Sequence, residues 1–245
     1  MQNGLAMQSF CLRGFKTNEE VIAKLKECGV AGVELCGVHV DFADTAARDR
    51  VIQLYRDAGI RIVSIGVNGF STDEAAARNS FDFAQAAGCK VVSANFSPDG
   101  MWDAFRTAEK LADEYDINLG IHNHGGYHWL GSSEMLKYIF ANTSPRIGLM
   151  LDTAWAIDAK QDPVEMARTF ADRLYGVHAK DFVYNRERQH EDVVVGTGIL
   201  DLPGLFGALR ETGFDGELIL EYEGDVNNPV PALKECVAAI EKELP

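Results

Sequence analysis

Several features that mark other protein classes are missing from this sequence. No two cysteines form a C-x-x-C pair, and the total is odd, at five: Cys11, Cys28, Cys36, Cys89 and Cys236. Neither a disulfide framework nor a thiolate zinc knuckle is indicated, so a reducing compartment is expected. No apolar run approaches the roughly 20 residues that cross a bilayer, and the start lacks a secretory signal pattern. These absences predict a cytoplasmic protein without a membrane partner.

Basic residues are also scarce. The sequence has 23 Lys and Arg against 37 Asp and Glu, a net charge of −14. Nucleic-acid binding depends on neutralising phosphates with basic side chains, so no nucleic-acid partner is expected. No Pro/Ser-rich linker or charge block divides the 245 residues. We therefore expect one domain over residues 1–245, large enough to bury one sizeable core.

Short β-branched runs alternate with longer helical patterns along the whole chain. The predicted strands are 5–10, 30–35, 61–66, 90–95, 117–122, 146–151, 174–179 and 217–221. The predicted helices are 17–28, 44–58, 72–87, 101–115, 132–141, 162–172, 203–212 and 229–242. Eight such units predict an α/β fold, a (β/α)8 TIM barrel. An open doubly wound sheet is disfavoured because no G-x-G-x-x-G motif follows any predicted strand.

Local signals support these boundaries independently of the count. Residues 17–20, Thr-Asn-Glu-Glu, read as a capping box that opens the first helix. Gly29, Gly59 and Gly88 each follow a predicted helix, at the position where a glycine commonly ends one.

Polar side chains of metal-ligand type close the last four predicted strands, namely His122, Asp152, His178 and Glu221. Taken singly, each has an ordinary structural explanation: a strand-end His is often a hydrogen-bonded residue, and an Asp before Thr is often a cap. In a barrel, however, these strand ends converge on one face, where two carboxylates without a cation would compete for a poorly solvated space. The pattern therefore predicts a mononuclear divalent-metal site.

Longer segments carry a family resemblance over essentially the whole chain: GVAGVELCG, LDTAW, VHAKDF and GTGILDLPGLFGALRETGFDGELILEYEGD. The sequence resembles the xylose isomerase-like TIM barrels, which include sugar phosphate isomerases/epimerases, ketose 3-epimerases and inosose dehydratases. The resemblance implies a small carbohydrate substrate and one divalent metal ion, most often Mn, with Zn, Co or Mg as other options. It assigns Asp152, His178 and Glu221 as ligands, and such barrels commonly form homo-oligomers.

The fifth-strand ligand departs from the family pattern, because His122 stands where the epimerases have a Glu. Replacing that carboxylate by a neutral imidazole changes the formal charge of a divalent site from −1 to 0, which makes the metal a stronger Lewis acid. It also removes one of the two carboxylate bases that the epimerase mechanism uses. Ketose 3-epimerisation by that mechanism therefore needs a different second proton carrier.

Strand alternation identifies side chains that could supply it. If the strands continue, His124, Lys180 and Glu223 point the same way as the ligands two residues before them. We predict catalytic roles for Glu221 as base, for His124 as acid/base and for Lys180 as an oxyanion or hydroxyl partner. The alternatives are a salt bridge from Lys180 to Asp181 or another rim carboxylate, and a loop-orienting hydrogen bond from His124.

Candidate substrate-binding residues are Glu34, Trp155, Arg186 and Glu223. Glu34, at the end of the second strand, could bind substrate hydroxyls or orient a ligand. Trp155 could offer an apolar face to a sugar ring, although simple packing is the alternative. Arg186 lies in a charged loop that suits an anionic or hydroxyl-rich ligand but could equally be solvated. Gly196 and Gly198, in the same stretch, are weak evidence for phosphate binding.

These features predict a metal-dependent sugar or sugar phosphate isomerase/epimerase working through an enediolate. The runner-up is a lyase or dehydratase that expels a β-leaving group from a keto-sugar or keto-glycoside, since elimination needs one base and one acid. A non-catalytic sugar-binding barrel subunit is a further alternative. The nuclease branch of the fold is disfavoured, because it has a His three residues after the sixth-strand Asp, where this chain has Trp155.

Overall fold

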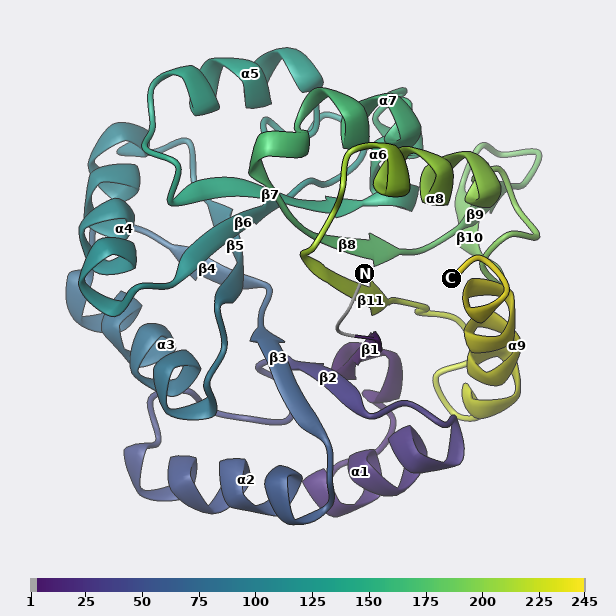
Figure 1. Ribbon diagram of the computed structural model, residues 1–245, viewed down its shortest axis with the longest axis horizontal. Coiled ribbons are helices and arrows are strands. Elements are labelled where there is room, and N and C mark those ends of the chain that lie inside the picture. Colours follow the sequence, from purple (N-terminus) through teal and green to yellow (C-terminus); the bar gives the residue numbers. More distant parts are fainter. Residues whose placement is uncertain (1–3, 245) are drawn as a thin grey trace.

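In the computed structural model, which describes residues 4–244, a parallel sheet curls into a barrel surrounded by helices (Figure 1). The sheet strands are β1 (Leu5–Gln8), β2 (Gly32–Leu35), β3 (Arg61–Ile65), β4 (Asn68–Phe70), β5 (Val91–Phe96), β6 (Asn118–His122), β7 (Ile147–Asp152), β8 (Leu174–Ala179) and β11 (Glu217–Leu220). The helices are α1 (Asn18–Glu27), α2 (Thr45–Asp57), α3 (Glu74–Ala87), α4 (Met101–Tyr115), α5 (Ser133–Ala141), α6 (Thr153–Asp158), α7 (Pro163–Thr169), α8 (Leu202–Glu211) and α9 (Val230–Glu241).

The order of the sheet is β3-β2-β1-β11-β8-β7-β6-β5-β4, and all its pairings are parallel. The two end strands, β3 and β4, are consecutive in the chain and are separated by residues 66–67. Together they occupy one barrel position, because β3 pairs with β2 and β4 pairs with β5. Counted this way, the described residues form eight barrel positions, and the predicted (β/α)8 TIM barrel is confirmed.

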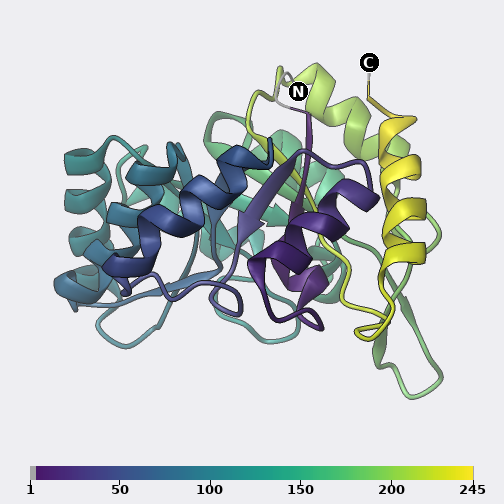
Figure 2. The same ribbon diagram turned by 90° about the horizontal axis from the view of Figure 1, so that it is seen from below.

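Several elements differ from the sequence prediction. The first strand ends at Gln8, because its side chain accepts a hydrogen bond from Phe10 N and caps a 3-10 turn, η1 (Ser9–Leu12). The third strand is split, as described above. Helix α6 begins directly after β7, and the predicted helix over 162–172 ends at Thr169, followed by the 3-10 turn η2 (Ala171–Arg173). An unpredicted antiparallel hairpin, β9 (Phe182–Tyr184) and β10 (His190–Asp192), extends from the barrel (Figure 2).

The predicted capping box and the three predicted glycine stops are confirmed. Thr17 and Glu20 form the reciprocal capping box of α1, with Glu20 N donating to Thr17 Oγ1 and Thr17 N donating to Glu20 Oε2. Gly29, Gly59 and Gly88 all have positive φ angles, between 73° and 81°. These caps satisfy backbone groups that a helix leaves unpaired, so each helix ends where its connection to the next strand starts.

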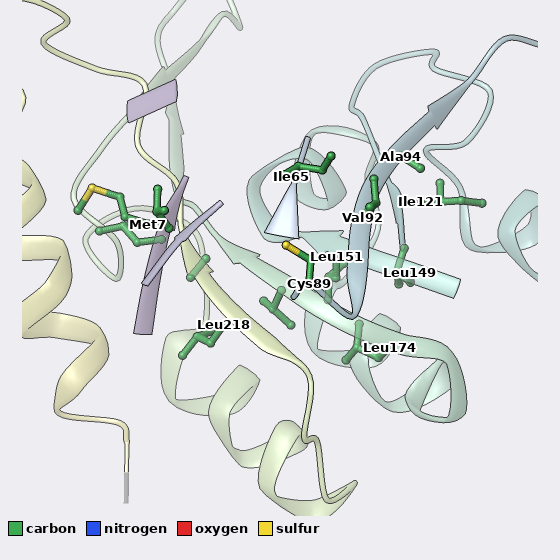
Figure 3. Packing of buried hydrophobic residues seen from close by; sticks show 14 of the residues in the cluster. Met7, Ile65, Cys89, Val92, Ala94, Ile121, Leu149, Leu151, Leu174 and Leu218 are labelled. Atoms are coloured by element: carbon green, nitrogen blue, oxygen red, sulfur yellow. The ribbon is translucent and has the colours of Figure 1, made fainter. Parts of the chain in front are cut away.

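Two apolar layers hold the barrel. Inside it, beneath the strand ends that carry the site, a small cluster fills the interior: Ala6, Val63, Val91, Met150 and Ile219. Outside it, a large cluster runs between strands and helices, and Figure 3 shows Ile121, Leu149 and Leu174 within it. Because successive strand residues face opposite ways, the strands that send Ile121 and Leu149 outward send polar side chains inward at their ends. Within residues 4–244, no helix is long and apolar enough to cross a membrane.

Candidate metal centre

The four predicted ligands come together at the carboxyl ends of β6, β7, β8 and β11, which are neighbours in the sheet (Figure 1). His122, Asp152, His178 and Glu221 are all buried, and each offers one donor atom within 4.8 Å of the others. His122 and Asp152 are the last residues of their strands, whereas Glu221 follows β11 directly and still donates its backbone N–H to Ala179 O. The barrel therefore turns four strand ends into one buried cluster.

The spacing of the donors fits a small cation. His178 Nδ1 lies 2.6 Å from Glu221 Oε2, His122 Nε2 lies 3.1 Å from His178 Nδ1, and His122 Nε2 lies 3.4 Å from Asp152 Oδ2. Metal–ligand bonds of about 2 Å place tetrahedral donors roughly 3–3.5 Å apart, so a divalent ion can be accommodated with little movement. Asp152 Oδ2 is buried and has no hydrogen-bond partner among the described residues, as expected of an atom that a cation would satisfy.

The pKa values of two of the ligand candidates, His178 and Glu221, are strongly shifted by their neighbours. Burial lowers the pKa of His178, but Glu34 and Glu221 outweigh that effect and raise it to about 10. Burial by itself raises the pKa of Glu221, but Lys180, His122 and His178 have the larger opposite effect. The pKa of Glu221 therefore lies well below its usual range. A metal ion would displace the imidazole proton and take over the neutralisation of the two carboxylates.

A second layer holds the ligands in place. His178 Nε2 lies 3.1 Å from Glu34 Oε1, and Gln8 Nε2 donates to the same Glu34 oxygen at 2.5 Å. Metal-binding histidines characteristically present their other ring nitrogen to a carboxylate in this way. Glu34 is buried beneath His178, so of its two predicted roles the geometry matches the orientation of a ligand.

Asp152 is fixed from both sides. Asn123 forms a reciprocal pair with its backbone, donating to Asp152 O at 3.0 Å and accepting from Asp152 N at 2.9 Å. Trp155 N donates to Asp152 Oδ1 at 2.8 Å, so this oxygen caps α6 while Oδ2 faces the donor cluster. Asn123 and Gln8 were not predicted, although each is a polar residue at a strand end, which is the signal that identified the ligands.

Lys180 lies on the other side of Glu221. Strand β8 ends at Ala179, as predicted, so the condition that it continue to Lys180 is not met, yet the buried amine still reaches the site. Lys180 Nζ donates to Glu223 Oε1 and lies 3.7 Å from Glu221 Oε1 and 3.9 Å from Asp192 Oδ1. The salt bridge to another rim carboxylate is therefore formed, with Glu223 and not Asp181 as the partner. The two oxygens of Glu221 face different groups: Oε2 faces the histidines and Oε1 faces Lys180.

A cavity of about 470 Å³ opens above the cluster. Its lining includes His122 and Glu221 from the ligand set, together with the predicted His124, Trp155 and Glu223. His124 packs against His122, with the two ring centroids 4.8 Å apart. Burial, and after it the charges of His122 and His128, lower the pKa of His124 to about 4. Lys180 lies behind this wall, with its Nζ 5.2 Å from the centroid of the Trp155 ring.

Arg186 is placed elsewhere, in the exposed turn between β9 and β10 and outside the cavity lining. The other walls come from the opposite half of the barrel and were not predicted: Gln8, Phe10, Cys36, Gly37, Val38, Gly66 and Val67. Phe10, Val38 and Val67 make that side apolar. Apolar side chains that follow strands resemble ordinary core residues in a sequence, so no signal marked them.

A family profile described as xylose isomerase-like TIM barrel matches residues 22–242. The chain belongs to the xylose isomerase-like TIM barrel family. It is 27% identical to the rhizopine catabolism protein MocC of Rhizobium meliloti, with 87% of this chain and 77% of that protein covered. It is 25% identical to an inosose dehydratase of Lacticaseibacillus casei over 52% of this chain, and the match spans about half, 49%, of the dehydratase.

Solved structures share the fold of this family member. The structure of an L-ribulose 3-epimerase superposes with a TM-score of 0.75 at 19% identity, covering 98% of this chain and 94% of the epimerase. The names of the relatives include dehydratases and a 3-oxo-isoapionate decarboxylase of Pectobacterium atrosepticum, which is 24% identical over 82% of this chain and 76% of that protein. The family and the buried cluster together identify a candidate divalent-metal site in a xylose isomerase-like barrel. The family does not fix which reaction takes place there.

Proposed function

We propose that this protein is a metal-dependent lyase that removes water from a polyhydroxylated ketone, such as a keto-sugar or a keto-cyclitol, through an enediolate. The observation that carries the proposal is the asymmetry of the site: His122 stands in the ligand set, and Glu221 is the carboxylate that is both a ligand candidate and part of the cavity lining. One base beside a separate hydrogen-bond donor for the leaving group suits elimination better than the matched pair of bases that epimerisation uses. The dehydratases among the relatives support the same choice.

A divalent cation held by the four ligands would supply Lewis acidity toward the substrate carbonyl. Glu221 takes the proton from the carbon next to that carbonyl. Lys180, 3.7 Å from Glu221 Oε1, keeps this carboxylate ionised and oriented before the transfer. The pKa of His124, about 4, keeps its imidazole neutral at pH 7, so its ring N–H hydrogen-bonds the departing hydroxyl group, which leaves with the proton that Glu221 removed. The products are the unsaturated ketone and water.

The remaining cavity groups bind and shield the substrate. Glu223 lines the cavity, where it can accept hydrogen bonds from substrate hydroxyls while its Oε1 is held by Lys180. Trp155 and Phe10 supply apolar surface on opposite parts of the lining, which suits the C–H face of a ring. Excluding water from this space strengthens the electrostatic contacts to the reacting group.

Epimerisation is the second candidate, and the position of His124 favours it. The side chain lines the same cavity as Glu221, and its Nδ1 is buried without a hydrogen-bond partner among residues 4–244. A free imidazole nitrogen there could return a proton to the other face of an enediolate.

The two reactions are distinguished by incubating the Mn-loaded protein with keto-sugars and with inosose in deuterated water and following the products by NMR. Elimination predicts loss of a hydroxyl group and a new unsaturated ketone. Deuterium at the alpha carbon with the skeleton intact would favour the epimerase instead. If the substrates stay unchanged and unlabelled while metal is bound, both proposals are wrong and a non-catalytic barrel is favoured.

A further inference from the structure

The carboxylate of Asp181 is enclosed by backbone amides. Its side chain is 1% exposed, and within the described chain it accepts five backbone hydrogen bonds: from Phe182, Gly196, Gly198, Ile199 and Leu200, at 2.8–3.0 Å. Oδ2 accepts from the two glycines and Oδ1 accepts from the other three. Concave arrangements of successive N–H groups bind anions, and here the anion belongs to the protein itself.

The contacts of Asp181 explain the role of the Gly196-Thr197-Gly198 motif, which has no part in the proposed reaction. The sequence Gly196-Thr197-Gly198 was weak evidence for phosphate binding, but Asp181 already occupies its N–H groups. Gly196 has a φ of 85°, a conformation that favours glycine, and a Cβ on Gly198 would lie 2.5 Å from Asp181 Oδ1. The loop is therefore shaped to close around this carboxylate.

The closed loop begins at the end of the β9–β10 hairpin. Val193 N donates to Asp181 O at 3.1 Å, and Asp192 pairs with Phe182 across the hairpin. Asp192 in turn accepts a hydrogen bond from Glu223 N at 3.0 Å and lies 3.9 Å from Lys180 Nζ. A chain of contacts therefore runs from Asp181, through the hairpin, to the two side chains that stand beside Glu221.

We propose that Asp181 is a positioning residue that sets Asp192, and through it Glu223 and Lys180, beside the metal centre. The adjacent residues Lys180 and Asp181 have different roles. The lysine side chain reaches the site, and the aspartate holds the loop that positions Asp192 and Glu223 next to that lysine. This inference rests on the proposed function for its catalytic consequence, and on the contacts alone for its structural one.

The test compares Asp181→Asn with Asp201→Asn. The asparagine at 181 keeps one acceptor oxygen but turns an NH₂ group toward backbone donors. Asp201 caps α8 by accepting from Gly204 N at 3.0 Å, so its replacement perturbs the end of the same loop without touching the Asp181 contacts. Gly198→Ala serves as a second variant, because it disturbs the contact from the loop side and leaves the carboxylate intact.

Amide hydrogen exchange followed by NMR gives a readout that needs no substrate. We expect exchange of the Glu223 amide to accelerate at least about tenfold in Asp181→Asn and in Gly198→Ala, together with the Gly196 amide, and to stay at the wild-type rate in Asp201→Asn. If Gly196 is exposed in both variants while Glu223 exchanges as in the wild type, Asp181 holds only its loop and the inference is wrong.

Kinetics test the catalytic consequence on whichever keto-sugar is turned over. Asp181→Asn should lower kcat more than it raises KM, and adding Asp192→Asn to it should cost little more than Asp192→Asn alone, because both changes break the same chain of contacts. Additive effects would overturn the positioning role. A wild-type protein that turns over no keto-sugar would refute the proposed function, and the exchange comparison would still decide the role of Asp181.

Discussion

The two halves of the barrel carry the same strand and helix plan but different chemistry at their strand ends. From β6 to β11 the barrel strands carry, within one residue of their ends, side chains that can bind a metal: His122, Asp152, His178 and Glu221. From β1 to β3 they carry or lead to groups that support or enclose the site: Gln8, Glu34 and Val67. The backbone of a barrel therefore offers eight equivalent positions, and the side chains alone decide which half offers ligands for a cation.

Removing a ligand from the half that carries the metal-ligand candidates should have the largest effect on metal affinity. Asp152→Asn keeps an oxygen to accept from Trp155 N and cap α6, but it removes the charge that faces the donor cluster. We expect metal affinity to fall by on the order of a hundredfold or more, at or beyond the upper end of the roughly 10–100-fold cost of second-layer changes. Calorimetric titration with Mn²⁺ and Zn²⁺ measures this, with circular dichroism as a check on folding. An unchanged metal affinity would show that Asp152 is not a ligand.

The supporting half is tested by Glu34→Gln, which places an amide against His178 and Gln8 where a carboxylate oxygen now lies close to both. The side chain keeps its size, so the fold should persist. Metal affinity or turnover should drop by roughly 10–100-fold, the range typical of an outer-layer partner of a ligand. An affinity equal to that of the wild type would mean that the two halves are energetically independent.

His122→Glu sharpens the comparison by making the ligand set more acidic. A third carboxylate lowers the charge of a divalent site from 0 to −1 and weakens its Lewis acidity, while supplying a second base. Dehydration should slow by about tenfold, a barrier change of ~1.4 kcal/mol, and deuterium exchange without loss of water should become the main reaction. Faster dehydration in this variant would show that the imidazole does not favour elimination.

The smallest effect is expected from Thr17→Ala, in the supporting half but far from the cavity lining. The change removes the capping box that opens α1. Loss of such a cap should lower the melting temperature by about 2–4 °C in a chain of this size and leave metal affinity unaltered. Thermal unfolding of the metal-free and metal-loaded forms measures both, and a parallel loss of metal affinity would contradict the separation of stability from function in this half.

Much of the fold followed from local patterns, because hydrophobic periodicity and helix caps act over a few residues. The missed elements are short or depend on distant partners. β4 has three residues and is defined by its pairing with β5, and β10 pairs with β9 within a charged loop. Helix α6 begins at the metal-ligand candidate Asp152 itself, whose Oδ1 caps it. The sequence offered the cap and the ligand as alternatives for Asp152, and only the structure gives one oxygen to each, with Oδ1 at the helix and Oδ2 toward His122.

The sequence by itself determined the alternation of strands and helices, the four polar residues at strand ends and the substitution of His122 for a carboxylate. These are properties of residue type and spacing. Only the tertiary structure decided that Lys180 pairs with Glu223, that Glu34 stands behind His178, and that Asp181 anchors the loop that leads to Asp192. Such contacts join residues far apart in the chain, and barrel closure brings them within reach of one another.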